Sequence, residues 1–169
     1  GLVEGLLALA SLESSREVRR EAGALHAAAR EVATEFDARC KAAGVTLSLD
    51  LAATQDVGAD PIQARRLIQN LIDNALAHAA GLTRLRIVTR DTADGTELSV
   101  EDDGAGVTTA DLPRLFDRFY RTDKSRRAGG SGLGLSIVRQ VAELHGGSAG
   151  AEPARPKGLR VIVTIPRVD

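Results

Sequence analysis

The chain has 169 residues, with 22 Lys and Arg against 23 Asp and Glu and a formal net charge of -1. This length suits one ordinary domain with a small appendage. The balanced charge argues against a protein that binds nucleic acid or an anionic membrane through bulk electrostatics. Cys40 is the single cysteine, which excludes an internal disulfide and a cysteine-based zinc site and fits a reducing compartment.

Two helices are predicted in the first quarter of the chain. Residues 2–12 carry a helical apolar stripe with a heptad-like seam, so we expect this segment to pack on a partner. Glu4 interrupts its apolar run, which is far shorter than the roughly 20 residues that span a bilayer. A polar linker without periodicity follows at about 13–24, and a helix is predicted from about Leu25 to Ala43, before Gly44.

The next segments alternate between strand and helix signals. Residues 45–51 alternate apolar and polar side chains, which predicts a strand with Val45, Leu47 and Leu49 facing the core. A helix follows over about 60–80, because Asp60 suits the N-cap and Pro61 the first turn, and Gln63 stands where a capping box places Glu or Gln.

The second half of the chain predicts strands at 83–90 and 96–102, a helix at about 132–145 and a final strand at 158–166. Strands that occur in adjacent pairs favour an α/β sandwich, with one mixed, largely antiparallel sheet and helices packed on one face. Phe116, Phe119 and Tyr120 lie close together between the predicted strand at 96–102 and the predicted helix at 132–145, in a chain with only four aromatic residues. This cluster is either a docking element or an anchor for a loop.

Residues 101–107, EDDGAGV, place a carboxylate at the end of a predicted strand. Side chains alternate along a strand, so Asp102 shares the core face with Leu98 and Val100 and needs a hydrogen-bond partner there. Gly104 and Gly106 would let another group approach the backbone beside it. A plain turn would have the same sequence, so the pattern is weak when it stands alone.

Two further patterns are compatible with nucleotide binding. Asn70 and Asn74 lie four residues apart on one helix face, where their amide oxygens could hold Mg²⁺ or simply form a helix interface. Glycines at 130, 132 and 134 lead into a helix whose N-terminal N–H groups would suit a phosphate. The apolar residues that follow, from Leu133 onward, argue against a flexible linker.

In this order, Asn70–Asn74, the DxGxG box at 102–106, LFDRFYR and GSGLGLSIV resemble the boxes of the catalytic ATP-binding domain of sensor histidine kinases. That family belongs to the Bergerat-fold ATPases, together with gyrase and MutL. The resemblance covers about residue 25 to the C-terminus. Residues 1–15 resemble the tail of the second helix of the dimerisation domain, 16–24 would be a linker, and 25–169 the catalytic domain.

The resemblance implies ATP and Mg²⁺ as cofactors. Asp102 would bind the adenine amino group, with Asn74 and nearby Asn70 as metal ligands. Segment 107–131 would be a mobile ATP lid, from which Arg121 and Lys124 could reach the terminal phosphates. The other residues that the resemblance assigns to nucleotide binding are His78, Gly104, Gly106, Gly130, Gly132, Leu133 and Gly134. Two positions depart from the family pattern: Ala77 replaces a usual Lys or Arg, and Leu159 stands where Thr is common.

Position 70 favours transfer to histidine over hydrolysis. Related ATPases resemble one another in having a glutamate general base there, whereas Asn70 cannot take a proton at neutral pH. A neutral imidazole is already a nucleophile and needs no such base. None of His26, His78 and His145 lies in the family's acceptor sequence, so we expect the phosphoacceptor on an N-terminal part outside this sequence.

The resemblance also predicts the partners. These are the dimerisation domain of the same kinase and a downstream response regulator, with a homodimeric parent and no nucleic acid. We expect a cytoplasmic location; the sequence leaves open whether the parent is anchored in the inner membrane and whether the fragment is monomeric. The alternative function is a non-catalytic nucleotide sensor, in which ATP binding orders the lid and changes a protein contact.

Overall fold

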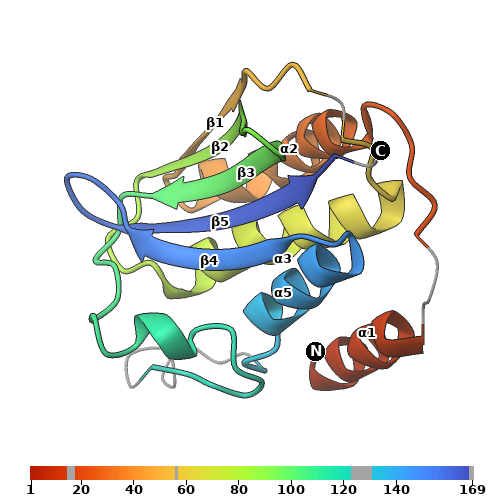
Figure 1. Ribbon diagram of the computed structural model, residues 1–169. Helices are drawn as coiled ribbons and strands as arrows, with labels where there is room; N and C mark the ends of the chain where they lie inside the picture. Colours follow the sequence, from red (N-terminus) through yellow and green to blue (C-terminus); the bar gives the residue numbers. More distant parts are fainter. Residues whose placement is uncertain (15–17, 56, 123–130, 168–169) are drawn as a thin grey trace.

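The computed structural model is an α/β sandwich in which helices cover one face of a five-stranded sheet (Figure 1). It describes residues 1–14, 18–55, 57–122 and 131–167. The elements in chain order are α1 (Leu2–Ser14), α2 (Ala24–Ala42), β1 (Thr46–Leu51), α3 (Pro61–His78), β2 (Arg84–Asp91), β3 (Gly95–Asp102), the 3-10 helix η1 (Leu112–Arg114), α5 (Gly134–Leu144), β4 (Ser148–Pro153) and β5 (Leu159–Pro166).

The sheet has the strand order β1-β2-β3-β5-β4. Only β1 and β2 pair in parallel, and the other neighbours are antiparallel, which confirms the predicted mixed sheet. The sequence prediction missed β4, because its residues SAGAEP include Gly, Pro, Ala and Glu, which are depleted in strands. Pairing with β5 holds them in the sheet nonetheless.

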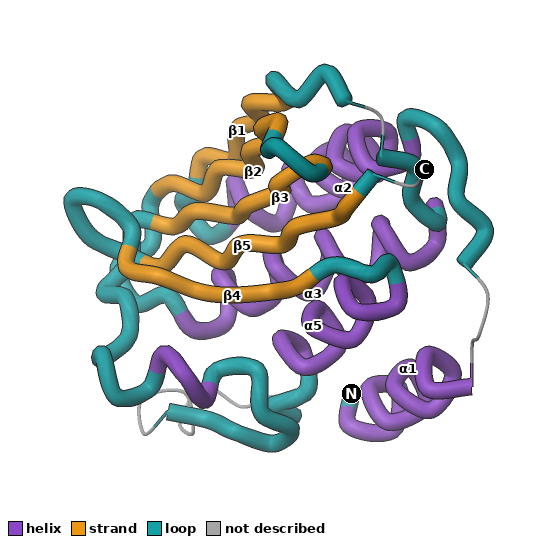
Figure 2. The backbone as a smooth tube through the Cα atoms, viewed as in Figure 1, coloured by secondary structure: helices purple, strands orange, loops and turns teal. Residues whose placement is uncertain are grey.

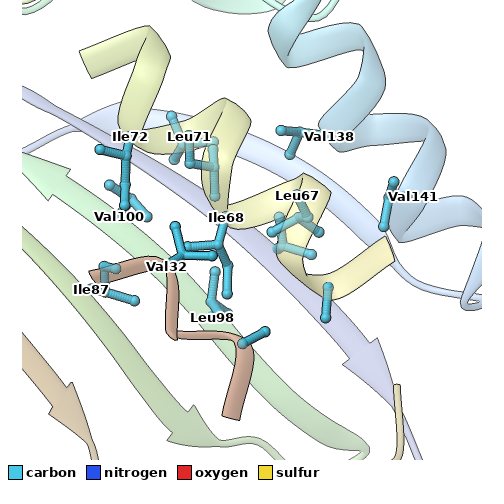
Figure 3. Packing of buried hydrophobic residues seen from close by; sticks show 14 of the residues in the cluster. Val32, Leu67, Ile68, Leu71, Ile72, Ile87, Leu98, Val100, Val138 and Val141 are labelled. Atoms are coloured by element: carbon cyan, nitrogen blue, oxygen red, sulfur yellow. The ribbon is translucent and has the colours of Figure 1, made fainter. Parts of the chain in front are cut away.

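The core lies between the sheet and the layer formed by α2, α3 and α5 (Figure 2). Figure 3 shows Ile68 and Ile72 of α3 packed toward Leu98 and Val100 of β3, with Val32 of α2 beside them. These five side chains are at most 4% exposed. Helix α3 therefore runs through the middle of the structure, and its position is fixed by apolar packing along most of its length.

The opposite face of the sheet is polar and carries several ion pairs. Arg160 of β5 contacts Glu97 and Glu101 of β3 and Glu152 of β4, while Asp50 of β1 pairs with two arginines of β2. Such a charged face remains stable in water without a covering layer. This explains why helices occur on one face alone.

Strand β1 departs from the predicted burial. Val45 is buried, as expected, but Leu47 is only half-buried and Leu49 is 39% exposed. The cause is position in the sheet, because β1 is an edge strand and pairs with β2 alone. The alternating pattern thus predicted the strand and its core-facing side correctly, since Leu47 packs against the core, but not the exposure that an edge position leaves.

The start of α3 follows the predicted capping only in part. Oδ1 of Asp60 accepts hydrogen bonds from the N–H groups of Ile62 and Gln63, each at 3.0 Å, as an N-cap should. Gln63 does not complete a capping box. The N–H of Asp60 instead donates to Nε2 of His145 at 3.0 Å, which joins the start of α3 to the end of α5.

The N-terminal segment packs on the helical layer. Leu9 and Leu12 of α1 are buried, and α1 lies beside α5 in Figure 1. The predicted polar linker is anchored near its end, since Glu21 pairs with Ala59 and Arg20 donates to the carbonyl of His145. Within the described ranges, no helix is long and apolar enough to span a membrane.

Candidate functional site

A large cleft lies between α3, the N-terminal end of α5 and the loop that follows β3. Its volume is about 1500 Å³, and residues of α1 border one end. Most predicted site residues meet here even though they come from distant parts of the sequence. Those that line the cleft are Asn70, Asn74, His78, Asp102, Gly106, Arg121, Gly132 and Gly134.

Asp102 reaches the cleft from the C-terminal end of β3 and is only 9% exposed. Its Oδ1 accepts two backbone hydrogen bonds, from Gly104 at 2.9 Å and from Leu159 at 3.2 Å. Burial raises the pKa of this carboxyl, and the neighbouring charge of Asp103 adds to that effect, against the two hydrogen bonds that lower it. Oδ2 accepts no hydrogen bond from any residue that the structure describes, so the carboxylate retains acceptor capacity at the cleft.

Two glycines allow the chain to close tightly around Asp102. Gly158 has φ 109°, and a Cβ there would lie 1.9 Å from the carbonyl oxygen of Asp102. Gly106 has φ 68° and would place a Cβ 2.9 Å from the carbonyl oxygen of Gly158. A side chain at either position is therefore excluded by strain and by contact with backbone. Gly104, in contrast, is buried against Ala79 and does not line the cleft.

Asn70 and Asn74 are half-buried on the side of α3 that faces the cleft. The side-chain N–H of Asn70 donates to the carbonyl of Arg66 at 2.8 Å, one turn earlier in the helix. Its Oδ1 would lie 3.4 Å from a Cβ at Gly134, so the amide oxygen faces the start of α5. The two helices thus bring an amide oxygen and a glycine-rich helix terminus together.

Helix α5 begins at Gly134, two residues later than the predicted start. Gly132 has φ 71° and packs on the backbone of Phe119. Leu133 is fully buried and does not line the cleft, because its side chain packs beneath the turn and toward Gly5 of α1. Gly132 and Gly134 have no side chains, so at these two positions the backbone itself lines the cleft.

The loop between β3 and α5 is held by its aromatic residues. Phe116 is buried under Arg139 of α5, whose guanidinium lies 5.1 Å from the ring centre. The hydroxyl of Tyr120 donates to Asp111 at 2.5 Å. Phe119 is 56% exposed, with φ 64°, and its N–H donates to the carbonyl of Gly132 at 2.9 Å. Of the three aromatics, two anchor the loop and one points outward.

Basic groups face the cleft from this loop. Arg121 lines it near His78, and partial burial together with the positive charge of Arg121 lowers the pKa of that histidine. Two predicted phosphate-binding residues, Lys124 and Gly130, lie outside the described residues. Among the described ones, no three His, Cys, Asp or Glu side chains form a metal-binding group.

Comparisons with known proteins identify this arrangement. Residues 59–169 match the family described as histidine kinase-, DNA gyrase B-, and HSP90-like ATPase. The chain is 36% identical over 132 residues to the sensor histidine kinase component HK1 of Mycobacterium tuberculosis, which covers 78% of this chain and 77% of HK1. The chain belongs to this ATPase family, as the catalytic domain of a sensor histidine kinase.

Other relatives agree with that assignment. The histidine kinase catalytic domain is 35% identical over 148 residues to the sensor protein IrlS of Burkholderia pseudomallei, covering 86% of this chain but only 29% of IrlS. The solved catalytic domain of the histidine kinase ThkA superposes with a TM-score of 0.75 at 25% identity, over 89% of this chain and 99% of that one. The fold is accordingly the Bergerat fold predicted from the sequence.

Sequence reasoning missed several residues of this kinase domain's cleft. Leu159 lines it and supplies a backbone N–H to Asp102, although the sequence marked it only as a departure from the family pattern. Ala79 packs on Gly104 at the end of α3. Arg66 lines the cleft one turn before Asn70. The helical spacing of Arg66 and Asn70 was a usable signal, whereas the contacts of Leu159 and Ala79 depend on the tertiary fold.

Proposed function

We propose that this chain binds ATP with Mg²⁺ and transfers the γ-phosphoryl group to a histidine of a dimerisation domain in two-component signal transduction. The observation that carries the proposal is the hydrogen bonding of Asp102. Two backbone N–H groups hold its Oδ1, and Oδ2 remains available as an acceptor in a buried end of the cleft. An exocyclic amino group of adenine is a donor that fits this carboxylate.

The phosphates would extend from Asp102 along α3 toward the start of α5. Backbone N–H groups at a helix N-terminus favour anions, and Gly132 and Gly134 expose that backbone to the cleft. Arg121 supplies positive charge on the lid side, and we expect Lys124 and Gly130 of the same loop to contribute. Gly104 and Leu133 do not line the cleft, so we propose supporting roles for them: Gly104 donates its N–H to Asp102, and Leu133 packs against α1.

Asn74 and Asn70 are the residues that would hold Mg²⁺. Both line the cleft, and neutral amide oxygens suit a metal whose remaining ligands are waters and phosphate oxygens. The metal would neutralise charge on the β- and γ-phosphates. With the amide N–H of Asn70 directed to Arg66, its oxygen is left to face the start of α5.

Transfer to histidine is favoured by the chemistry at Asn70. Its carboxamide cannot accept a proton at neutral pH, so it cannot activate a water or a serine hydroxyl. In the transfer, the lone pair of an imidazole nitrogen forms the new bond to phosphorus. The bond from phosphorus to the β–γ bridging oxygen breaks with its electron pair left on ADP, and the proton of the second ring nitrogen goes to solvent.

The packing of α1 supports a domain boundary between the N-terminal segment and the catalytic domain. We propose that residues 1–15 are the tail of a dimerisation-domain helix and 16–24 a linker to the catalytic domain at 25–169, because α1 packs on α5 and borders the cleft. ThkA has been crystallised in complex with the response regulator TrrA. By analogy we propose a response regulator as the downstream partner of this kinase and a cytoplasmic location for this domain.

Calorimetric titration of ATP tests the proposal, with and without Mg²⁺, in the wild-type chain and in two variants. We expect Asp102→Asn to abolish binding, because an amide would present a donor to the adenine amino group. Asn74→Ala should remove the dependence of affinity on Mg²⁺. Absence of binding in the wild type would overturn the proposal.

A phosphotransfer assay separates catalysis from sensing. The chain is mixed with a separately prepared dimerisation domain and radiolabelled ATP, and acid-labile phosphohistidine is measured. Transfer that disappears in Asp102→Asn supports the kinase. Normal ATP binding without any transfer, in the intact parent kinase as well, would instead favour the non-catalytic nucleotide sensor.

A further inference from the structure

Arg66 lines the cleft, and the function proposed above gives it no role. It precedes Asn70 by one turn of α3, and both residues line the cleft. The hydrogen bond from the side chain of Asn70 to the carbonyl of Arg66 fixes the spatial relation between them. A group bound near the amide oxygen of Asn70 is therefore within one helical turn, about 6 Å along the axis, of the Arg66 backbone.

The electrostatic surroundings of Arg66 differ from those of the neighbouring arginines. Arg65 pairs with Glu31 and Glu35 on α2, and Arg39 pairs with Asp73. In the part of the chain that the structure describes, the guanidinium of Arg66 forms no ion pair and donates only to the neutral Oε1 of Gln63, at 3.3 Å. A half-buried guanidinium that forms no ion pair with a described residue is suited to bind an anionic ligand.

The position of Arg66 along α3 indicates which part of a nucleotide it would meet. Asp102 lies near Ala79, at the C-terminal end of α3, whereas Arg66 lies 13 residues earlier, or about 20 Å along the axis. Arg66 also shares its helix face with Ala77, three turns away, where the chain has no basic side chain. On this face of α3, the guanidinium of Arg66 therefore lies toward the N-terminal end of the helix, and Asp102 lies near its C-terminal end.

The same end of the cleft is bordered by α1. Glu4 and Gly5 line it together with Arg66, and a Cβ at Gly5 would meet the side chain of Leu133 at 2.9 Å, directly before α5. If α1 continues into the dimerisation domain, a phosphoacceptor would approach from this side. Arg66 lines the cleft together with this segment and with the glycine-rich start of α5.

We propose that Arg66 binds the terminal phosphate of the nucleotide and stabilises the negative charge on the phosphoryl group as it is transferred. This inference rests on the proposed function, and it adds a cation to the cleft-facing side of α3, on which Ala77 supplies none. The planar guanidinium presents two parallel N–H groups, which match two oxygens of one phosphate. Charge on the equatorial oxygens of the transferred group is what such a residue stabilises.

Binding of Mg-ATP and Mg-ADP to Arg66→Gln, compared by calorimetry, tests this assignment. We expect the substitution to weaken Mg-ATP roughly ten- to a hundredfold, the usual effect of losing a hydrogen bond to a charged group. Mg-ADP lacks the terminal phosphate and should change less than about threefold. Arg66→Lys keeps the charge without the paired donors, so it should retain part of the preference for ATP.

Arg65→Gln is the matched control, because it removes the adjacent arginine from the same helix but faces Glu31 and Glu35 instead of the cleft. It should leave both affinities unchanged. Equal weakening of ATP and ADP by Arg66→Gln, or no effect on either, would overturn the assignment while the proposed function stands. A wild-type chain that binds neither nucleotide overturns both, and the wild-type titration alone distinguishes the two failures.

Discussion

Leu159 donates its backbone N–H to Oδ1 of Asp102 across 3.2 Å, although the two residues lie 57 positions apart in the chain. The contact joins the start of β5 to the end of β3, which are antiparallel neighbours in the sheet. Substitution of the side chain by any residue other than proline leaves a backbone donor in place. The orientation of the Asp102 carboxylate is therefore determined by strand pairing, and Leu159 can differ from the family pattern without loss of this contact.

The nucleotide-free protein should become more stable when Asp102 is replaced by Asn. Burial raises the pKa of Asp102 in the folded state, so ionisation begins to cost folding free energy as pH rises above the ordinary value of 3.8, and the cost is complete above the folded-state pKa. Asparagine can still accept from Gly104 and Leu159 and carries no charge. Thermal melting at pH 7 should show a higher midpoint, and a lower one would contradict the stated cause of the shift.

Gly158→Ala should destabilise the fold and disturb the site together. Its Cβ would lie 1.9 Å from the carbonyl oxygen of Asp102, so β3 and β5 must separate locally, at a cost of roughly 2–4 kcal/mol. Gly150→Ala on β4 is the matched control, since a Cβ there meets nothing within 4 Å. Urea unfolding of both variants measures the difference; similar midpoints would show that the strands accommodate the side chain.

Asp103 should support ATP binding without facing the nucleotide. Its carboxylate accepts hydrogen bonds from the N–H and hydroxyl of Thr83 and the N–H and Nε of Arg84, which hold its pKa well below the usual range. This stabilisation is complete above the ordinary pKa and is lost only in strong acid. Asp103→Asn should lower stability by about 1–2 kcal/mol and ATP affinity several-fold, because it loosens the end of β3 that carries Asp102.

Asp91 offers the comparison for Asp103. It accepts hydrogen bonds from Thr54 and Gln55 at the opposite end of β2, far along the strand from the cleft. Asp91→Asn should lower the melting temperature but leave ATP affinity unchanged in calorimetry. If both variants lost ATP affinity to the same degree, the effect of Asp103 would be one of general stability.

His145 should make folding stability depend on pH below neutrality. Because the N–H of Asp60 must donate to Nε2, the ring is neutral and Nδ1–H donates to the carbonyl of Val141 at 2.8 Å. Burial lowers its pKa, so protonation of the unfolded chain lowers stability as pH falls from 6.5 toward the folded-state pKa. Urea unfolding at pH 7.5 and 5.5 should show this loss, and His145→Gln should reduce it while costing about 2 kcal/mol at pH 7.5.

His78→Gln serves as a comparison in that experiment. His78 also has a pKa lowered by partial burial, but it lies at the cleft and the structure assigns it no link between helices. Removing it should reduce the pH dependence less than removing His145. The opposite ranking would indicate that the cleft, and not the junction of α3 and α5, dominates the response to acid.

The sequence alone predicted the elements that have strong local signals. Asp60 and Pro61 marked the start of α3, and the alternation before Asp102 identified both the strand and its core face. The prediction failed where a distant partner decides the outcome. Small residues form β4 because β5 pairs with them, and Asp60 donates to His145 where a capping box would have used Gln63.

The candidate site also divides into features with a local sequence signal and features that depend on distant contacts. Spacing placed Asn70 and Asn74 on one helix face, and both line the cleft. The sequence could not show that Leu133 would be buried and only its neighbours Gly132 and Gly134 exposed to the cleft, because this depends on how α1 and α5 pack. Nor could it single out Arg66 from Arg65, since the difference lies in the acidic residues that α2 places beside one of them.

The parallel pairing of β1 and β2 has a further consequence for engineering of the chain. Because parallel neighbours need a crossover, α3 is itself the connection between these strands and is tethered to the sheet at both ends. New termini introduced at the β2–β3 hairpin, residues 92–94, would leave this tether whole. A break between α3 and β2 would release the C-terminal end of the helix beside Asp102, so permuted or split versions of the domain should be opened at the hairpin.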